Sequence, residues 1–150
     1  MDRQDEIRDF IKPAAMAGAA LALSLGIYLA LVEILRRVEE PFRGFAQGVD
    51  AQPLRYAAYG AAAFVVLLLL LLRPRLTRRR PDDDTPAALR RLQNASLVML
   101  VLGEIPAVAG LALFLVAGQN VDFYRLLFAS LLLTFINFPR RSAWEEWLKG

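Results

Sequence analysis

The stretch that decides the fold is Tyr56–Leu72, YAAYGAAAFVVLLLLLL, which contains no charged residue and ends in six consecutive leucines. Two further runs, Pro13–Val32 and Ile105–Val121, also lack any charge. The chain has 150 residues, of which 57% are hydrophobic, and a soluble core of that size is too small to cover three such runs. The composition therefore predicts an all-α, polytopic membrane protein.

Four segments have the length of the hydrocarbon layer, since a spanning helix needs about 20 mostly apolar residues. We expect transmembrane helices over about 14–35, 54–72, 95–117 and 121–138. They form two antiparallel hairpins in one domain, 1–150, and the tight turn at 118–120 makes the third and fourth helices neighbours.

The counts of Lys and Arg predict the orientation, because cytoplasmic loops carry an excess of both. Thirteen of these 18 residues lie in the amino-terminal segment, in the connection 73–94 or in the carboxy-terminal segment, and the other five lie on the opposite side. We therefore expect a multi-pass protein of the cell (inner) membrane with both termini and the basic loop 73–94 in the cytoplasm.

Arginines and tryptophans flank the expected spans. An arginine cluster follows the leucine tract, and we interpret it as a contact with anionic headgroups of the bilayer, not with nucleic acid; its members are Arg73, Arg75, Arg78, Arg79 and Arg80. In the segment 140–150, Trp144 and Trp147 share one face of a short amphipathic helix. We expect this helix at the membrane interface, and a docking face for a partner subunit is the alternative.

Three charged residues near the span ends call for a local explanation. Asp122 and Arg125 lie in the first turns of the fourth span, and we expect both to reach the headgroups by snorkelling. Glu33 precedes Arg37 by four residues, which favours an ion pair on the helix surface.

Small residues in the first span predict helix packing. Gly18, Ala22, Gly26 and Ala30 follow one another at intervals of four. Because lipid offers no hydrophobic gain on helix pairing, close backbone approach at small residues drives association. We expect this stripe to be a contact face, within the chain or between copies, and Gly103 and Gly110 to be further packing positions. The expected partners are copies of this chain or other membrane subunits.

Glu104 is the acid inside the third span, close to the bilayer midplane. An ionised carboxylate there costs about 2.5–3.5 kcal/mol, so we expect a protonated carboxyl group unless a cation lies beside it. Two residues on, Pro106 removes the amide that would bond to the carbonyl of Leu102. A carboxyl group and a freed carbonyl within one turn are the elements of a proton or cation site.

The helix register across the tight turn suggests a partner for this acid. It places Glu104 level with Phe135, so that a hydroxyl or amide of the fourth span can bond to the carboxyl group; the candidates are Thr134, Asn137 and Ser130. Two interpretations stay open. Glu104 joins two helices by a hydrogen bond worth about 1 kcal/mol, or it carries a proton or cation.

The segment Met99–Leu111, MLVLGEIPAVAGL, resembles the carboxylate-bearing helix of rotary ATPase proteolipid subunits, the c or K ring components. The shared pattern is an aliphatic run, the acid, and a Gly-Leu pair that starts six residues later, here Gly110-Leu111. The resemblance is confined to this helix. It implies that Glu104 is an ion-carrying carboxylate.

Several classes of function are excluded by composition. The chain has no Cys and no His, which excludes thiolate and imidazole metal sites, and we expect no metal and no cofactor. Its membrane serines have no candidate base besides Glu104, so we expect no catalytic residues. The sequence favours a small non-enzymatic membrane protein that self-associates or serves as a subunit of a larger complex. The alternative is a proteolipid-like bundle that translocates or senses ions through Glu104.

Overall fold

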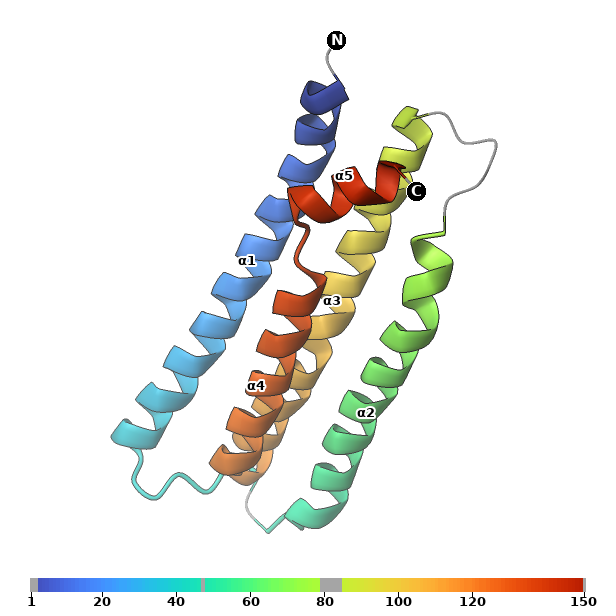
Figure 1. The fold of residues 1–150 in the computed structure, drawn as a ribbon. Helices are drawn as coiled ribbons and strands as arrows, with labels where there is room; N and C mark the ends of the chain where they lie inside the picture. Colours follow the sequence, from blue (N-terminus) through green and yellow to red (C-terminus); the bar gives the residue numbers. More distant parts are fainter. Residues whose placement is uncertain (1–2, 47, 79–84, 150) are drawn as a thin grey trace.

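The structure, a computed structural model, describes residues 3–46, 48–78 and 85–149, with side chains for all of these except 3–7, 141 and 147–149. The helices are α1 (Arg3–Val38), α2 (Ala51–Leu76), α3 (Thr85–Ala117), α4 (Asn120–Asn137) and α5 (Arg141–Lys149). Four long helices run side by side with alternating direction, and α5 lies across one end of the bundle (Figure 1). The all-α prediction is confirmed.

Three of these helices are long and apolar enough to cross a membrane: Arg8–Val38, Ala51–Leu76 and Thr85–Ala117. This finding is consistent with a membrane protein. The helix α4 has 18 residues, with Asp122 in its first turn, and it lies antiparallel to α3 along its whole length (Figure 1).

Large apolar side chains cover the outside of the bundle. Those that are more than half exposed occur on all four long helices and include Leu23, Ile27, Phe64, Leu70, Val101, Phe128 and Phe135. A soluble monomer rarely exposes a contiguous apolar surface of this extent. The exposed side chains are therefore those that hydrocarbon would cover.

Much of the basic connection 73–94 is helical. The helix α2 continues to Leu76, and α3 begins at Thr85, ahead of its apolar part. Arginine is a good helix former where water or headgroups solvate its charge, so both helices extend past their apolar parts. Of the predicted headgroup residues, Arg73, Arg75 and Arg78 are exposed, whereas Arg79 and Arg80 lie outside the described residues.

The helix α3 forms the centre of the bundle and packs against α1, α2 and α4. Within the described residues α1 and α2 do not contact each other, so the expected first hairpin is not a packed pair. On α3, a Cβ atom added at Gly110 would lie 2.9 Å from Leu126 Cβ, and one at Gly103 would lie 3.3 Å from Leu133 Cβ. These two glycines are thus where α4 approaches α3 most closely.

The connection between α1 and α2 is held against the end of α3, which explains why the two helices stand apart. Phe42 stacks on Phe114 with ring centroids 4.8 Å apart. The last four carbonyls of α3 all accept hydrogen bonds: Phe114 from Gly118 N (2.7 Å), Leu115 from Phe45 N (2.7 Å), Val116 from Ala46 N (3.2 Å) and Ala117 from the Gln119 amide (3.5 Å). The connection thus closes the end of α3.

The carboxy-terminal helix docks on the protein. Trp144 of α5 is 3% exposed and belongs to an apolar cluster whose other members are Ile11, Ala14, Leu89 and Leu92. It therefore lies between α1 and α3 instead of among lipid headgroups, because these two helices extend beyond their predicted spans and offer α5 an apolar surface. The side chain of Trp147 lies outside the described residues.

The small-residue stripe of α1 does not follow the packed face. Gly18 is buried against Phe138 and Leu100, whereas Ala22, Gly26 and Ala30 are exposed. The buried apolar residues are instead Ile11, Ala14, Leu25 and Val32. At 3.6 residues per turn, a four-residue interval drifts by about 40° per step, whereas the seven-residue interval that joins Ile11, Gly18, Leu25 and Val32 drifts by about 20°. The stripe therefore leaves the interior after Gly18.

Candidate functional site

The carboxyl group of Glu104 lies between α3 and α1. The Tyr28 hydroxyl donates a hydrogen bond of 2.8 Å to Glu104 Oε1, and the Ser24 hydroxyl donates to the same oxygen. Ser24 Oγ also lies 2.7 Å from the carbonyl oxygen of Leu21. Ser24 and Tyr28 are four residues apart, so they lie one above the other on the same face of α1.

The direction of the Glu104 side chain follows from its neighbours on α3. Gly103, Ala107 and Gly110 are buried and recur at the spacing of one helix face, and the contacts of both glycines show that this face meets α4. Glu104 follows Gly103 by one residue, which is about 100° around the helix. Its side chain is thereby turned from α4 towards α1.

The α3 backbone around the proline next to this site is hydrogen-bonded by a side chain of α4. Pro106 is fully buried, and the backbone N–H of Ala107 donates to Ser130 Oγ at 2.8 Å. The Ser130 hydroxyl in turn lies 3.5 Å from the carbonyl oxygen of Glu104. A side chain of α4 thus binds the α3 backbone on both sides of the proline, where the regular hydrogen bonds of a helix are interrupted.

The predicted partner on α4 is not the one that binds the carboxyl group. Thr134 is buried beside Gly103, but it forms no hydrogen bond with Glu104 within the described structure. The side chain of Leu102 packs on the other side of α3, with the cluster of Val65 and Leu69. The prediction of which turn of α4 lies beside Glu104 is therefore nearly right. The prediction that the carboxyl group points towards α4 is wrong.

Sequence reasoning did not single out Ser24 and Tyr28. The signal was a polar pair four residues apart inside a run without any charge. In such a run hydroxyl groups seek partners, because an unsatisfied polar group in hydrocarbon is costly. Combining this pair with the face of α3 opposite its glycines would have predicted the contact.

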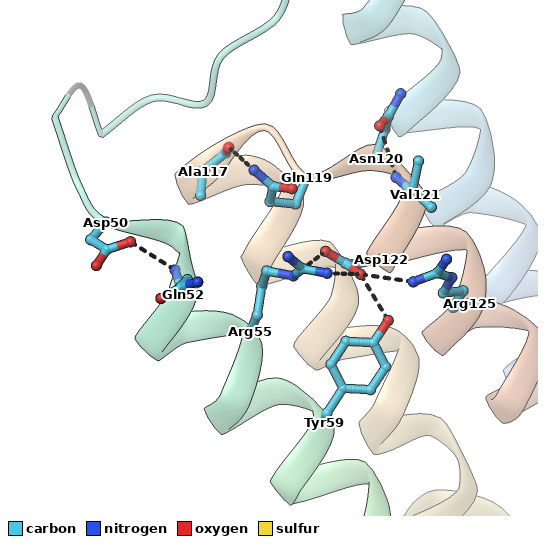
Figure 2. A network of polar contacts seen from close by, with 10 residues as sticks. All are labelled: Asp50, Gln52, Arg55, Tyr59, Ala117, Gln119, Asn120, Val121, Asp122 and Arg125. Carbon is cyan, nitrogen blue, oxygen red and sulfur yellow. Dashed lines mark hydrogen bonds and ion pairs between the residues drawn. The ribbon is translucent and has the colours of Figure 1, made fainter.

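A second acid, Asp122, has cationic partners (Figure 2). Its side chain is 3% exposed and accepts from Arg55 Nε at 2.8 Å and from the Tyr59 hydroxyl at 2.8 Å. Arg125 Nη1 lies 3.6 Å away. Figure 2 shows Arg55 and Tyr59 of α2 reaching the acid at the start of α4. Asp122 therefore joins two helices inside the protein and does not snorkel to the headgroups.

The third acid, Glu33, pairs with a different arginine than expected. Arg36 Nη1 lies 3.6 Å from Glu33 Oε1 and donates to the Tyr124 hydroxyl at 2.9 Å. Tyr124 in turn donates to Glu33. The group connects α1 with α4, since an arginine one turn along the helix from the acid can reach the tyrosine as well. The expected pair with Arg37 is replaced by this triad.

The three acids differ in what their partners can stabilise. Asp122 and Glu33 each have an arginine within 4 Å, so their partners compensate a carboxylate charge. The partners of Glu104 in the described structure are hydroxyl groups only. When its carboxyl group is protonated, it can donate to Ser24 Oγ while Ser24 donates to the Leu21 carbonyl, so that each hydroxyl has one acceptor. Within the described residues, the Glu104 carboxyl group is therefore bound by hydroxyl groups without a compensating positive charge.

No group of three His, Cys, Asp or Glu side chains comes together within the described residues. In comparisons with known proteins, no family model, no curated protein and no solved structure matches the chain. The likeness to the proteolipid helix therefore stays confined to Met99–Leu111.

Proposed function

We propose that the protein is a small non-enzymatic protein of the cell (inner) membrane that assembles with copies of itself, or with other membrane subunits, through the outer face of α1. The observation that carries this proposal is the exposure of Ala22, Gly26 and Ala30. A Cβ atom added at Gly26 would meet nothing within 4 Å. A second helix could therefore approach the backbone of α1 closely at this place, as small residues allow in lipid.

In the proposed topology α4 is a fourth span. Its 18 residues give a length of about 27 Å, close to the hydrocarbon thickness of about 30 Å. The charge of Asp122 is compensated by Arg55. This pairing lowers the free-energy cost of placing the acid in a membrane-spanning helix. An even number of spans returns the chain to its starting side, and the excess of Lys and Arg there favours the cytoplasm.

The assembly proposal is tested by Gly26→Leu. In a mild detergent or a nanodisc, we expect the native mass of the wild-type protein to exceed that of one chain, and Gly26→Leu to release single chains or companion subunits, because leucine blocks close backbone approach. Gly60→Leu on α2 is the matched control, since Gly60 is also without a contact within 4 Å and should leave the mass unchanged. Equal masses for the wild type and Gly26→Leu would contradict the proposed face.

A second candidate function, the handling of protons or cations at Glu104, is favoured by one observation. Glu104 is partly buried in the bundle, and its partners are two hydroxyl groups, Ser24 and Tyr28. Carbodiimides modify protonated carboxyl groups in apolar surroundings, so we expect labelling at Glu104 and none at the arginine-paired Asp122. Absence of label at Glu104 in the folded protein would contradict a protonated carboxyl group.

Glu104→Gln separates a structural role from an ion-linked role. Glutamine keeps the oxygen that accepts hydrogen bonds from Ser24 and Tyr28. We therefore expect the free energy of unfolding to stay within about 1 kcal/mol of the wild-type value. Passive proton flux into liposomes that contain the protein should fall to that of empty liposomes if Glu104 carries protons. Flux equal to that of the wild type would leave Glu104 the role of joining α1 and α3.

A further inference from the structure

A hollow of about 330 Å³ lies at one end of the bundle. It is the end that α5 crosses (Figure 1). The hollow lies between the last turn of α2, the first half of α3 and the junction of α4 with α5. Its volume is at the lower end of the range of about 300–1,000 Å³ for small-molecule sites. The described residues that line it include two arginines, Arg73 and Arg140, and no acid.

The two arginines come from distant segments and reach one place. Arg73 belongs to the last turn of α2, and Arg140 lies between α4 and α5. The Arg140 guanidinium is held 4.9 Å above the ring of Phe135, with Nη2 3.5 Å from the Phe135 carbonyl oxygen. Both contacts restrict the side chain, so one positive charge is fixed at the hollow before any ligand arrives.

Two uncharged donors add to this charge. Ser96 is 4% exposed and lines the hollow, and its hydroxyl has no hydrogen-bond partner in the described part of the chain. Asn137, which also lines the hollow, donates one amide hydrogen to the Leu133 carbonyl at 2.8 Å and keeps a second. Within the described residues no side-chain N or O atom is both buried and without a partner, so the Ser96 hydroxyl reaches the hollow and can donate to a ligand there.

We propose that this hollow binds the phosphate group of an anionic membrane lipid. Two guanidinium groups and neutral donors are the groups that bind a phosphate most strongly. Arg73 directly follows the leucine tract Leu67–Leu72, which places it at the depth of the headgroups. Ile136 lines the hollow and is 54% exposed, so an acyl chain attached to the phosphate meets an apolar side chain at the rim. The site is separate from Glu104 and from the outer face of α1.

The test uses the full chain in mild detergent, with phosphatidylglycerol as the probe and phosphatidylcholine as the neutral reference. We expect native mass spectra to show one phosphatidylglycerol retained per chain and little phosphatidylcholine. The double variant Arg73→Gln/Arg140→Gln should retain at least about tenfold less phosphatidylglycerol, the loss that corresponds to about 1.4 kcal/mol. The control Arg8→Gln/Arg43→Gln removes the same charge from exposed residues that do not line the hollow, and it should retain the lipid as the wild type does.

A second variant keeps the test decisive if the double variant folds poorly. Ser96→Ala removes a hydroxyl that has no partner within the described residues, so the bundle should melt as the wild type does, while retention of phosphatidylglycerol falls severalfold. Equal retention by the wild type and both variants, or equal retention of phosphatidylcholine, would overturn the site. Displacement of the lipid by millimolar inorganic phosphate as effectively as by phosphatidylglycerol would assign the site to a soluble phosphate and overturn the lipid.

Discussion

At the scale of single residues, the bundle contains carboxyl groups in two kinds of surroundings. Asp122 is bound by Arg55 and Tyr59, whereas Glu104 is bound by hydroxyl groups. In a low dielectric the partner decides which form of a carboxyl group is stable. Replacement of each acid by its uncharged amide should therefore change the free energy of unfolding by different amounts.

We expect Asp122→Asn to lower the free energy of unfolding by about 2 kcal/mol, because Arg55 loses the charge that compensates its own. The side chain of Arg55 is 43% exposed, so water offsets part of the loss. Unfolding of the purified protein in mixed detergent micelles measures the effect. Arg125→Gln is the control: that side chain is 63% exposed, and its loss should change stability by less than about 1 kcal/mol. Equal effects of both variants would contradict the assigned network.

The direction of the Glu104 side chain shows what a sequence can predict at this scale. The length of the turn at 118–120 determines which residues of α4 lie beside which residues of α3. The hydrogen bond between Ala107 and Ser130 lies close to the position predicted in this way. Rotation of each helix about its own axis is set by which residues pack best, and the two glycines on α3 turn their face to α4. The partners of the acid therefore lie on α1 and not on α4, the other helix of its own hairpin.

At the scale of helices, the contact of α3 with α4 depends on the small residues between them. We expect Gly110→Ala to cost about 1–3 kcal/mol, because the added Cβ atom would lie 2.9 Å from Leu126 Cβ. Gly26→Ala is the matched control, since nothing lies within 4 Å of its added Cβ atom, and alanine favours the helix by up to about 1 kcal/mol. Melting curves in one detergent compare the two. A Gly110→Ala protein as stable as Gly26→Ala would contradict the close approach of the helices.

The docking of α5 should depend on Trp144, which is buried among residues of α1 and α3. We expect Trp144→Ala to release α5 and to raise amide hydrogen exchange across Arg141–Lys149 at least about tenfold, since truncation of a buried tryptophan costs about 3–5 kcal/mol. Exchange in α2 should stay as in the wild type. Glu146→Ala changes an exposed residue of the same helix and should leave α5 protected. Protection of α5 in the Trp144→Ala protein would indicate that other contacts hold it.

The helices themselves follow from charge-free runs, but their ends and neighbours do not. Hydropathy identifies the apolar part of α1 and α3, whereas the polar turns beyond it form helix because α5 and the rest of the bundle stabilise them. The composition of the stripe from Gly18 to Ala30 predicts one packed face, but its drift around the helix separates Gly18 from the rest. A pattern that spans several turns has to match the period of the packed face as well as its composition.

At the scale of the whole molecule, the networks of acids with arginines and the hollow with two arginines lie at opposite ends of the bundle. The Asp122 and Glu33 networks lie near the turn between α3 and α4, at the end away from α5 (Figures 1 and 2). Arg73, Arg140 and the start of α3 lie at the end where α5 crosses. The excess of Lys and Arg at the end with α5 is the pattern on which the proposed orientation rests.

The most direct test of membrane-spanning helices is labelling of single cysteines, because the chain has none of its own. Cysteines placed at Gln119, Arg78 and Ser142 probe the two ends of the bundle and the chain after α4. In intact cells, we predict that an impermeant thiol reagent labels Gln119→Cys from outside, and labels Arg78→Cys and Ser142→Cys only after the membrane is opened. Labelling of Gln119→Cys and Arg78→Cys from the same side would contradict the account.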